Sequence, residues 1–200
     1  MGTTGGVEND YQPMIEVPFD LFVTKKQNVF DVDGRFQFTD LFGNLLFEVE
    51  GLSADSSSHP NGRKFLIDAA GDTLITVVQA IKGKWEGFKG ESTQEREMMF
   101  KVERVTNTFT DKEFEIFLCD ENIEEGRTDF RMKGCPFKRS CTIYKGNSIL
   151  AQTSLMYTIG TGKYCVPRSR FRITLFPGPC DLVMIVSLVV IFFYKRRFLV

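Results

Sequence analysis

Hydrophobic and polar residues alternate along short segments from about Ile15 onward, and Gly, Asn and Asp separate these segments. Between residues 35 and 50, Phe36 and Phe38 alternate with polar residues before a turn, and Phe47 belongs to a second alternating run after it. Alternation of period two is typical of antiparallel strands with one buried face. The clearest predicted strands are residues 35–40, 45–50, 65–68, 73–81, 84–88, 98–103, 113–118, 130–133, 141–145, 148–154, 155–159 and 170–176. About a dozen strands with regular turns predict a mainly β sandwich or barrel.

The last nineteen residues, 182–200, follow a different pattern. From Leu182 to Tyr194 only Ser187 interrupts the apolar residues, and Asp181 is placed to cap the N-terminus of a helix. These thirteen residues would form about 20 Å of helix, which is short against a hydrocarbon core of about 30 Å. A helix that is apolar on every side needs lipid or protein around it. The pattern therefore allows two alternatives, a buried core helix and a C-terminal membrane anchor that ends at Lys195–Arg197.

Composition indicates a single domain with a large core. The chain has 200 residues, of which 42% are hydrophobic and 20 are Phe. We expect residues 1–13 to form a flexible tail and residues 14–200 to form one domain with a central helix at about 181–194. A net charge of −1 gives no general attraction to nucleic acid, and we expect a monomer.

Residues typical of catalytic or metal sites are scarce. His59 is the only histidine, no Gly-x-Ser-x-Gly motif occurs, and the five cysteines show no Cys-x-x-Cys spacing. Gly160–Lys163 resembles the end of a P-loop, but Tyr164 stands where Ser or Thr would bind magnesium. The acidic stretch 120–126 lacks the ligand spacing of an EF-hand. We therefore predict no catalytic residues, metal or cofactor, and an enzyme of unknown class stays an unsupported alternative.

The N-terminus and the cysteines indicate the cellular compartment. Residues 1–13 contain no basic region and no apolar run, so no signal peptide is predicted. Cysteines without a disulfide pattern are typical of a reducing compartment. We expect an intracellular protein in the cytoplasm, at the cytoplasmic face of the plasma membrane, or in the nucleus.

Basic residues give the one positive indication of a binding site. Arg168, Arg170 and Arg172 share one face of a predicted strand, where alternate side chains leave about 6.6 to 7 Å apart. Arg131 and Lys133 repeat the arrangement on another strand. Such rows could bind the phosphorylated headgroup of an anionic lipid. The alternative is a pair of solvated faces whose cations pair with the abundant glutamates.

Several segments taken together resemble one plant family. They are FQFTDLFGNLLFEVEG (36–51), FKGEST (88–93), DFRMKG (129–134), KRSCTIY (138–144), ILAQ (149–152), FRITLFPG (171–178) and DLVMIVSLVVI (181–191). In this order they resemble the LURP-one-related proteins, which are similar in fold to the C-terminal domain of tubby proteins and to phospholipid scramblases. The resemblance implies a closed antiparallel barrel of about twelve strands around a hydrophobic C-terminal helix. One departure is the ending FFYKRRFLV after Ile191, where the relatives have polar, acidic residues.

The resemblance also suggests a function. Tubby domains bind phosphoinositides and tether proteins to the plasma membrane, and the founding member of the plant family is associated with defence against pathogens. The leading hypothesis is therefore a non-catalytic binding module in plant defence signalling, whose partner is an anionic phospholipid headgroup or a protein. A C-terminally anchored membrane protein is the alternative.

Overall fold

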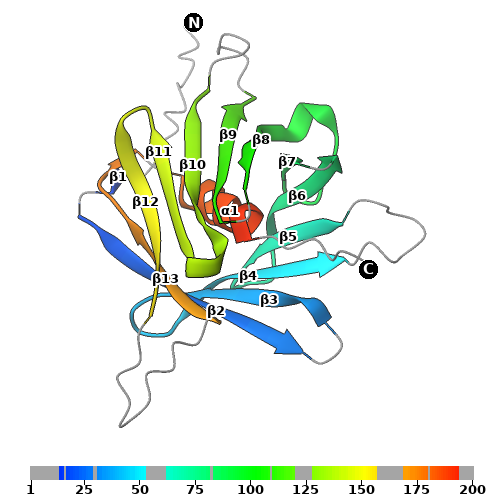
Figure 1. The fold of residues 1–200 in the computed structure, drawn as a ribbon. Coiled ribbons are helices and arrows are strands. Elements are labelled where there is room, and N and C mark those ends of the chain that lie inside the picture. The colour runs from blue at the N-terminus through cyan, green and yellow to red at the C-terminus, as the bar shows by residue number, and fades with distance from the viewer. Residues whose placement is uncertain are drawn as a thin grey trace, which may run out of the picture.

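A closed barrel of twelve antiparallel strands forms the body of the molecule (Figure 1). The computed structural model describes the chain except residues 1–13, 16, 29–30, 53–61, 82, 109, 120–127, 157–168, 180 and 194–200. The strands of the barrel are β2 (Phe19–Asn28), β3 (Asp31–Thr39), β4 (Leu45–Leu52), β5 (Arg63–Asp68), β6 (Thr73–Ile81), β7 (Lys84–Lys89), β8 (Met98–Asn107), β9 (Lys112–Leu118), β10 (Phe130–Cys135), β11 (Ser140–Lys145), β12 (Ser148–Leu155) and β13 (Arg170–Leu175). The predicted fold class, a mainly β closed barrel around a C-terminal helix, is confirmed.

The order of strands around the barrel follows the chain. Consecutive strands from β2 to β13 pair as neighbours, and β13 pairs with β2 to close the ring. A short ribbon of β1 (Met14–Ile15) and β14 (Gly178–Pro179) lies outside this ring, and two short 3₁₀ helices span Glu95–Glu97 and Pro136–Lys138. Closure removes the open edges at which an antiparallel sheet would otherwise pair with another chain.

The alternation predicted from the sequence sets the two faces of the sheet. Phe36 pairs with Val49 and Phe38 pairs with Phe47, and all four side chains are buried. Directly opposed residues point to the same face, so the apolar residue of each pair faces the interior while the polar neighbours face outward. The barrel interior is therefore lined by aromatic and branched side chains.

The helix α1 (Leu182–Phe193) lies inside the ring of strands (Figure 1). Asp181 caps it, since one carboxylate oxygen accepts hydrogen bonds from the backbone N–H groups of Val183 and Met184 at 2.9 and 3.1 Å. All ten residues from Met184 to Phe193 are buried. Ser187 is among them, and its hydroxyl donates to the Val183 carbonyl oxygen at 2.9 Å.

These contacts decide between the two alternatives for the C-terminal segment. Protein surrounds α1 on every side, as the core-helix alternative requires. Within the described residues, no helix is long and apolar enough to cross a bilayer. Phe192 and Phe193, which follow the part that resembles the family, still belong to the buried helix.

Some predictions concern residues at or beyond the limits of the structure. A separate strand over 155–159 was expected, but Leu155 ends β12 and residues 157–159 lie outside the described part. His59, the acidic stretch 120–126 and the glycine turn 160–163 lie outside it as well.

A basic mouth of the barrel as the candidate anion-binding site

One end of the barrel, where α1 finishes, collects basic side chains from five places in the chain. Neighbouring strands run in opposite directions, so β2 and β8 end at this mouth while β5, β9 and β11 begin there. The residues are Lys25, Lys64, Arg104, Lys112 and Arg139, and we call them the basic mouth. The two charged side chains that are buried in the described part, Lys64 and Arg139, both belong to it.

Aromatic rings hold several of these cations. The Nζ atom of Lys25 lies 5.4 Å from the ring centre of Phe36, which is its inward-facing partner on β3. The Arg139 guanidinium lies 5.6 and 5.2 Å from the rings of Phe171 and Phe193. Such cation–π contacts stabilise a cation in a partly desolvated position. These contacts bring both cations to the inner wall of the mouth.

The C-terminal end of α1 accounts for part of this arrangement. The Nζ atom of Lys112 donates a hydrogen bond to the Phe192 carbonyl oxygen at 3.4 Å. Carbonyl groups in the last turn of a helix lack partners within the helix and carry partial negative charge, so nearby cations are favourable. Lys112 therefore has a structural role, and Arg139 stacks on the last helical residue, Phe193.

Two hydrogen-bond donors near this end have no partner among the described residues. They are the indole Nε1 of Trp85, a residue only 3% exposed, and the Nε of Arg104. The Arg104 guanidinium lies 5.3 Å from the rings of both Trp85 and Phe114, and burial lowers the pKa of its side chain. Because a buried donor without a partner costs free energy, a ligand rich in acceptor atoms would gain from meeting these groups.

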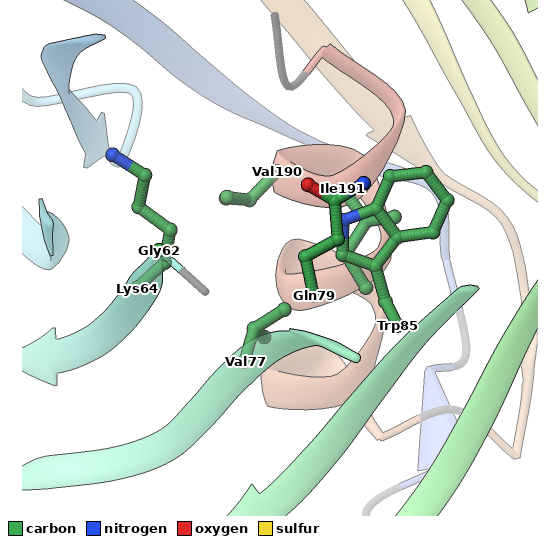
Figure 2. A pocket seen from close by; sticks show the side chains of 7 residues that line it. All are labelled: Gly62, Lys64, Val77, Gln79, Trp85, Val190 and Ile191. Carbon is green, nitrogen blue, oxygen red and sulfur yellow. The ribbon is translucent and has the colours of Figure 1, made fainter. Parts of the chain in front are cut away.

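A narrow crevice opens beside Trp85. Figure 2 shows Val77, Gln79 and Trp85 pointing toward Val190 and Ile191 of α1. Its free volume of about 10 Å³ corresponds to about one water molecule. A phosphate group is larger than that, so an anionic ligand would lie across the mouth and not inside this crevice.

The arginine row predicted on β13 faces the outside of the barrel. Arg170 and Arg172 are exposed, while Phe171, Ile173 and Leu175 are buried, as the alternation predicted. Arg168, the third member of the row, lies outside the described residues.

The outward basic residues are partly neutralised. The Arg172 guanidinium lies 3.2 Å from an Asp20 carboxylate oxygen and also donates to the Ser154 hydroxyl at 3.1 Å. On β10, the side chain of Arg131 lies 3.9 Å from a carboxylate oxygen of Glu113.

Arg131 and Lys133 do not join the row on β13. Both cations lie over the ring of Tyr144, at 6.0 and 5.3 Å. The strands β11 and β12 separate β10 from β13, a spacing of about 14 Å at about 4.8 Å per strand. The five predicted residues therefore do not form a single cluster.

Sequence reasoning overlooked the basic mouth, although a signal was present. Lys25 continues the inward positions of Leu21 and Val23, and Lys112 precedes the inward Phe114. A basic residue in the apolar phase of a strand, at its end, marks a cation at the mouth of a barrel. What the alternation does not reveal is which strand ends share one mouth.

Metal-ligating side chains and thiols of the described residues can be compared with the prediction of no metal or catalytic site. No group of three or more His, Cys, Asp or Glu side chains that could hold a metal ion occurs there. Burial strongly raises the pKa of the Cys141 thiol, and burial is also the main cause that raises the pKa of Cys119. Both thiols are therefore protonated at neutral pH and are poor nucleophiles.

Comparison with known proteins agrees with the architecture. The family model described as LURP-one-related matches residues 19–193. The chain belongs to the LURP-one-related family. Protein LURP-one-related 7 of Arabidopsis thaliana is 34% identical over 183 residues, which cover 92% of this chain and 93% of that protein. Protein LURP-one-related 15 of the same species is 31% identical over 192 residues, covering 94% and 84%.

A solved structure supports the same assignment for this LURP-one-related chain. An X-ray structure of an Arabidopsis thaliana protein superposes with a TM-score of 0.63 at 30% identity. The match covers 94% of this chain and 96% of the other. The barrel with its central helix is therefore shared with a protein of known structure.

Proposed function

We propose that this LURP-one-related protein is a non-catalytic module that binds the phosphorylated headgroup of an anionic phospholipid, a phosphoinositide above all. The basic mouth makes the contact, and binding tethers the protein to a membrane. The founding member of the family is associated with defence, so we place this tethering in plant defence signalling. The relatives named above carry no enzyme activity in their names, in keeping with a binding role.

One observation carries this proposal, namely that five basic side chains gather at one mouth. The buried charged side chains of the described part are both cations of this mouth. Positive charge in a partly desolvated position attracts phosphate more strongly than the same charge on an open surface.

The outward arginines would extend the same surface. Arg170 begins β13 at the end of the barrel that carries the mouth, and its side chain is exposed. Arg168 precedes it in the sequence, and Arg172 follows on the same face. These residues, with Arg131 and Lys133 on β10, are secondary candidates for contact with the headgroups of a membrane.

Vesicle flotation of the full chain tests the proposal. Binding to vesicles of phosphatidylcholine with a phosphoinositide is expected to exceed binding to phosphatidylcholine alone, and to fall as salt rises because exposed charges are screened. Equal recovery with the two kinds of vesicle would contradict the proposal. Soluble inositol phosphate, added as a competitor, distinguishes recognition of the headgroup from general attraction to the bilayer.

Charge-removing variants locate the site. The double variant Lys25→Gln, Lys112→Gln is expected to bind phosphoinositide vesicles roughly 30-fold more weakly, from about 1 kcal/mol per lysine. The matched control Lys89→Gln, Lys101→Gln removes the same charge from the outer wall and should keep most of the affinity. Thermal unfolding of each variant checks that the barrel stays folded. If only charge reversal of Arg168, Arg170 and Arg172 weakens binding, the site is on the outer wall and the mouth assignment is wrong.

A further inference from the structure

Exposed hydrophobic side chains gather at the end of the barrel opposite the basic mouth. Eight large hydrophobic residues of the described part are exposed, and three of them, Phe19, Leu41 and Phe42, line one groove. A fourth, Val17, directly precedes Pro18 of the same groove. The groove has a volume of about 580 Å³ and also contains Asp20, Asp40 and Arg172. Grouped exposed apolar residues mark interaction sites, whereas scattered single ones do not.

The most exposed of these residues stand on a hydrogen-bonded turn between β3 and β4. Leu41 is 73% and Phe42 is 85% exposed. One Asp40 carboxylate oxygen accepts hydrogen bonds from the N–H groups of Phe42 and Asn44 at 2.8 Å, and the other accepts from the Asn44 side-chain amide at 2.7 Å. Gly43 completes the turn at φ 85°, which glycine adopts without strain.

The hydrogen bonds of this turn fix the backbone of Leu41 and Phe42 before any partner binds. Because its backbone is already held by Asp40, a partner would not have to order it, and less conformational entropy is lost on association. The side-chain hydrogen bond from Asn44 is the main cause that lowers the pKa of Asp40, so its carboxylate stays ionised at neutral pH. The turn therefore holds the backbone of Leu41 and Phe42 next to an ionised carboxylate.

Charge decides what the groove can accept. Asp20 is neutralised by Arg172 at 3.2 Å, whereas the ionised Asp40 has no ion-pair partner among the described residues. The groove therefore carries one net negative charge, which repels an anionic bilayer and attracts a basic group.

We propose that this groove docks an extended segment of a partner protein, in which a bulky apolar side chain stands next to Lys or Arg. The apolar side chain packs against Phe19, Leu41 and Phe42, and the basic side chain pairs with Asp40. The groove lies at the end of the barrel away from the basic mouth, so both surfaces can be occupied at once. The inference does not depend on lipid binding at the basic mouth, because Phe19, Phe42 and Asp40 lie outside that mouth.

Selection from a library of random linear peptides tests the proposal with the full chain as target. The enriched peptides are expected to share a bulky apolar residue beside Lys or Arg. A synthetic peptide of that consensus should bind Phe42→Ser at least tenfold more weakly than the wild type. Val105→Ser is the matched control, because Val105 is 56% exposed at the other end of the barrel, and its affinity should not change.

A second variant separates charge from apolar contact. Asp40→Asn keeps an acceptor for the turn but removes the charge, so it should lose the preference for Lys or Arg while it still binds the apolar residue. Thermal unfolding checks that both variants keep the fold. The variant Lys25→Gln, Lys112→Gln should bind the peptide like the wild type, so failure of this proposal and failure of lipid binding are separately visible.

Four results would overturn the inference. The first two are that no consensus emerges, or that the consensus peptide binds Phe42→Ser and the wild type alike. The third is concentration-dependent sedimentation that disappears in Phe42→Ser, which would assign the groove to a second copy of the chain. The fourth is loss of vesicle binding in Phe42→Ser, which would assign the groove to lipid.

Discussion

Gly87, which is buried, and Gly51, which is exposed, are two strand positions that we expect to tolerate a methyl group differently. The space of a side chain at Gly87 is filled by the ring of Phe100, which is fully buried. At Gly51 the nearest atoms belong to the end of the Lys64 side chain, which is flexible. Neither glycine has a positive φ, so close packing and not backbone conformation explains why glycine stands at these positions.

Substitution to alanine should separate these two glycines. Gly87→Ala forces a close-packed ring or the backbone to shift, and we expect the free energy of unfolding to fall by about 1 to 3 kcal/mol. Gly51→Ala should cost less, because the end of Lys64 can move. Chemical denaturation of both variants measures the difference. Equal losses would show that the interior near Phe100 is not tightly packed.

Thr153 is a buried polar residue with a double role. Its hydroxyl donates to the Arg139 carbonyl oxygen at 2.8 Å and accepts from the Cys141 N–H at 2.8 Å. Arg139 has a φ of 52°, in the left-handed region that residues other than glycine seldom adopt. Thr153 thus holds the backbone that presents one cation of the basic mouth.

Removal of this hydroxyl should destabilise the start of β11. Thr153→Val preserves shape but leaves two backbone groups without their partner, and we expect a loss of about 1 to 3 kcal/mol in the free energy of unfolding. Thr142→Val is the control, since its hydroxyl accepts a single bond of 3.4 Å from Gln152. Thermal or chemical unfolding measures both variants. A larger effect at Thr142 would contradict the role given to Thr153.

At the scale of elements, α1 differs from a surface helix because it has no polar face. Its only polar residue, Ser187, bonds back to its own helix. Side-chain packing therefore stabilises it from every direction, and its start depends on one side chain, that of Asp181. In the last turn, the Phe192 carbonyl oxygen accepts a hydrogen bond from Lys112, which belongs to β9. The two ends of the helix are thus satisfied by different parts of the chain.

The cap can be tested without disturbing the core. Asp181→Ala removes the acceptor for two N–H groups, and we expect the protein to lose about 0.5 to 2 kcal/mol of stability. Asp181→Asn keeps an acceptor and should lose much less. Denaturant unfolding monitored by the fluorescence of Trp85 provides the measurement. If both variants lose the same amount, the charge of Asp181 matters more than its hydrogen bonds.

At the scale of the whole molecule, barrel and helix depend on one another. Without α1, the apolar residues of twelve strands would face an empty interior, and without the strands the helix would face water. Most sequence-distant contacts of the helix are with this wall, including the rings of Phe114 and Phe171 against Phe192 and Phe193.

Truncation tests this dependence. A chain that ends at Gly178 should fail to fold, because each large core side chain removed costs several kcal/mol, about 2 to 5 for Leu or Ile and about 3 to 5 for Phe. A chain that ends at Phe193 retains the whole helix and should fold. Near-ultraviolet circular dichroism and hydrogen exchange report the outcome. If the shorter chain folds, the helix is not needed for the core, and the membrane-anchor alternative would be favoured.

The sequence alone was sufficient for much of the fold. Alternation located the hairpin of β3 and β4 and the whole of β6. In a half-buried strand the order of apolar and polar residues itself shows which face is buried. It also placed Arg170 and Arg172 on the outer face correctly. It could not show that Asp20 on a distant strand would neutralise Arg172, because that pairing requires β13 to close against β2.

Periodicity is local, and for that reason the sequence determined which residues face inward and that the C-terminal helix must be enclosed. Only the tertiary structure decided what encloses it. The chain pattern of Leu182 to Phe193 is compatible with lipid or with protein, and closure of the barrel supplies the protein. Closure also brings Lys25, Lys64 and Arg104 to one mouth, since which strand ends meet depends on the direction and order of strands far apart in the chain.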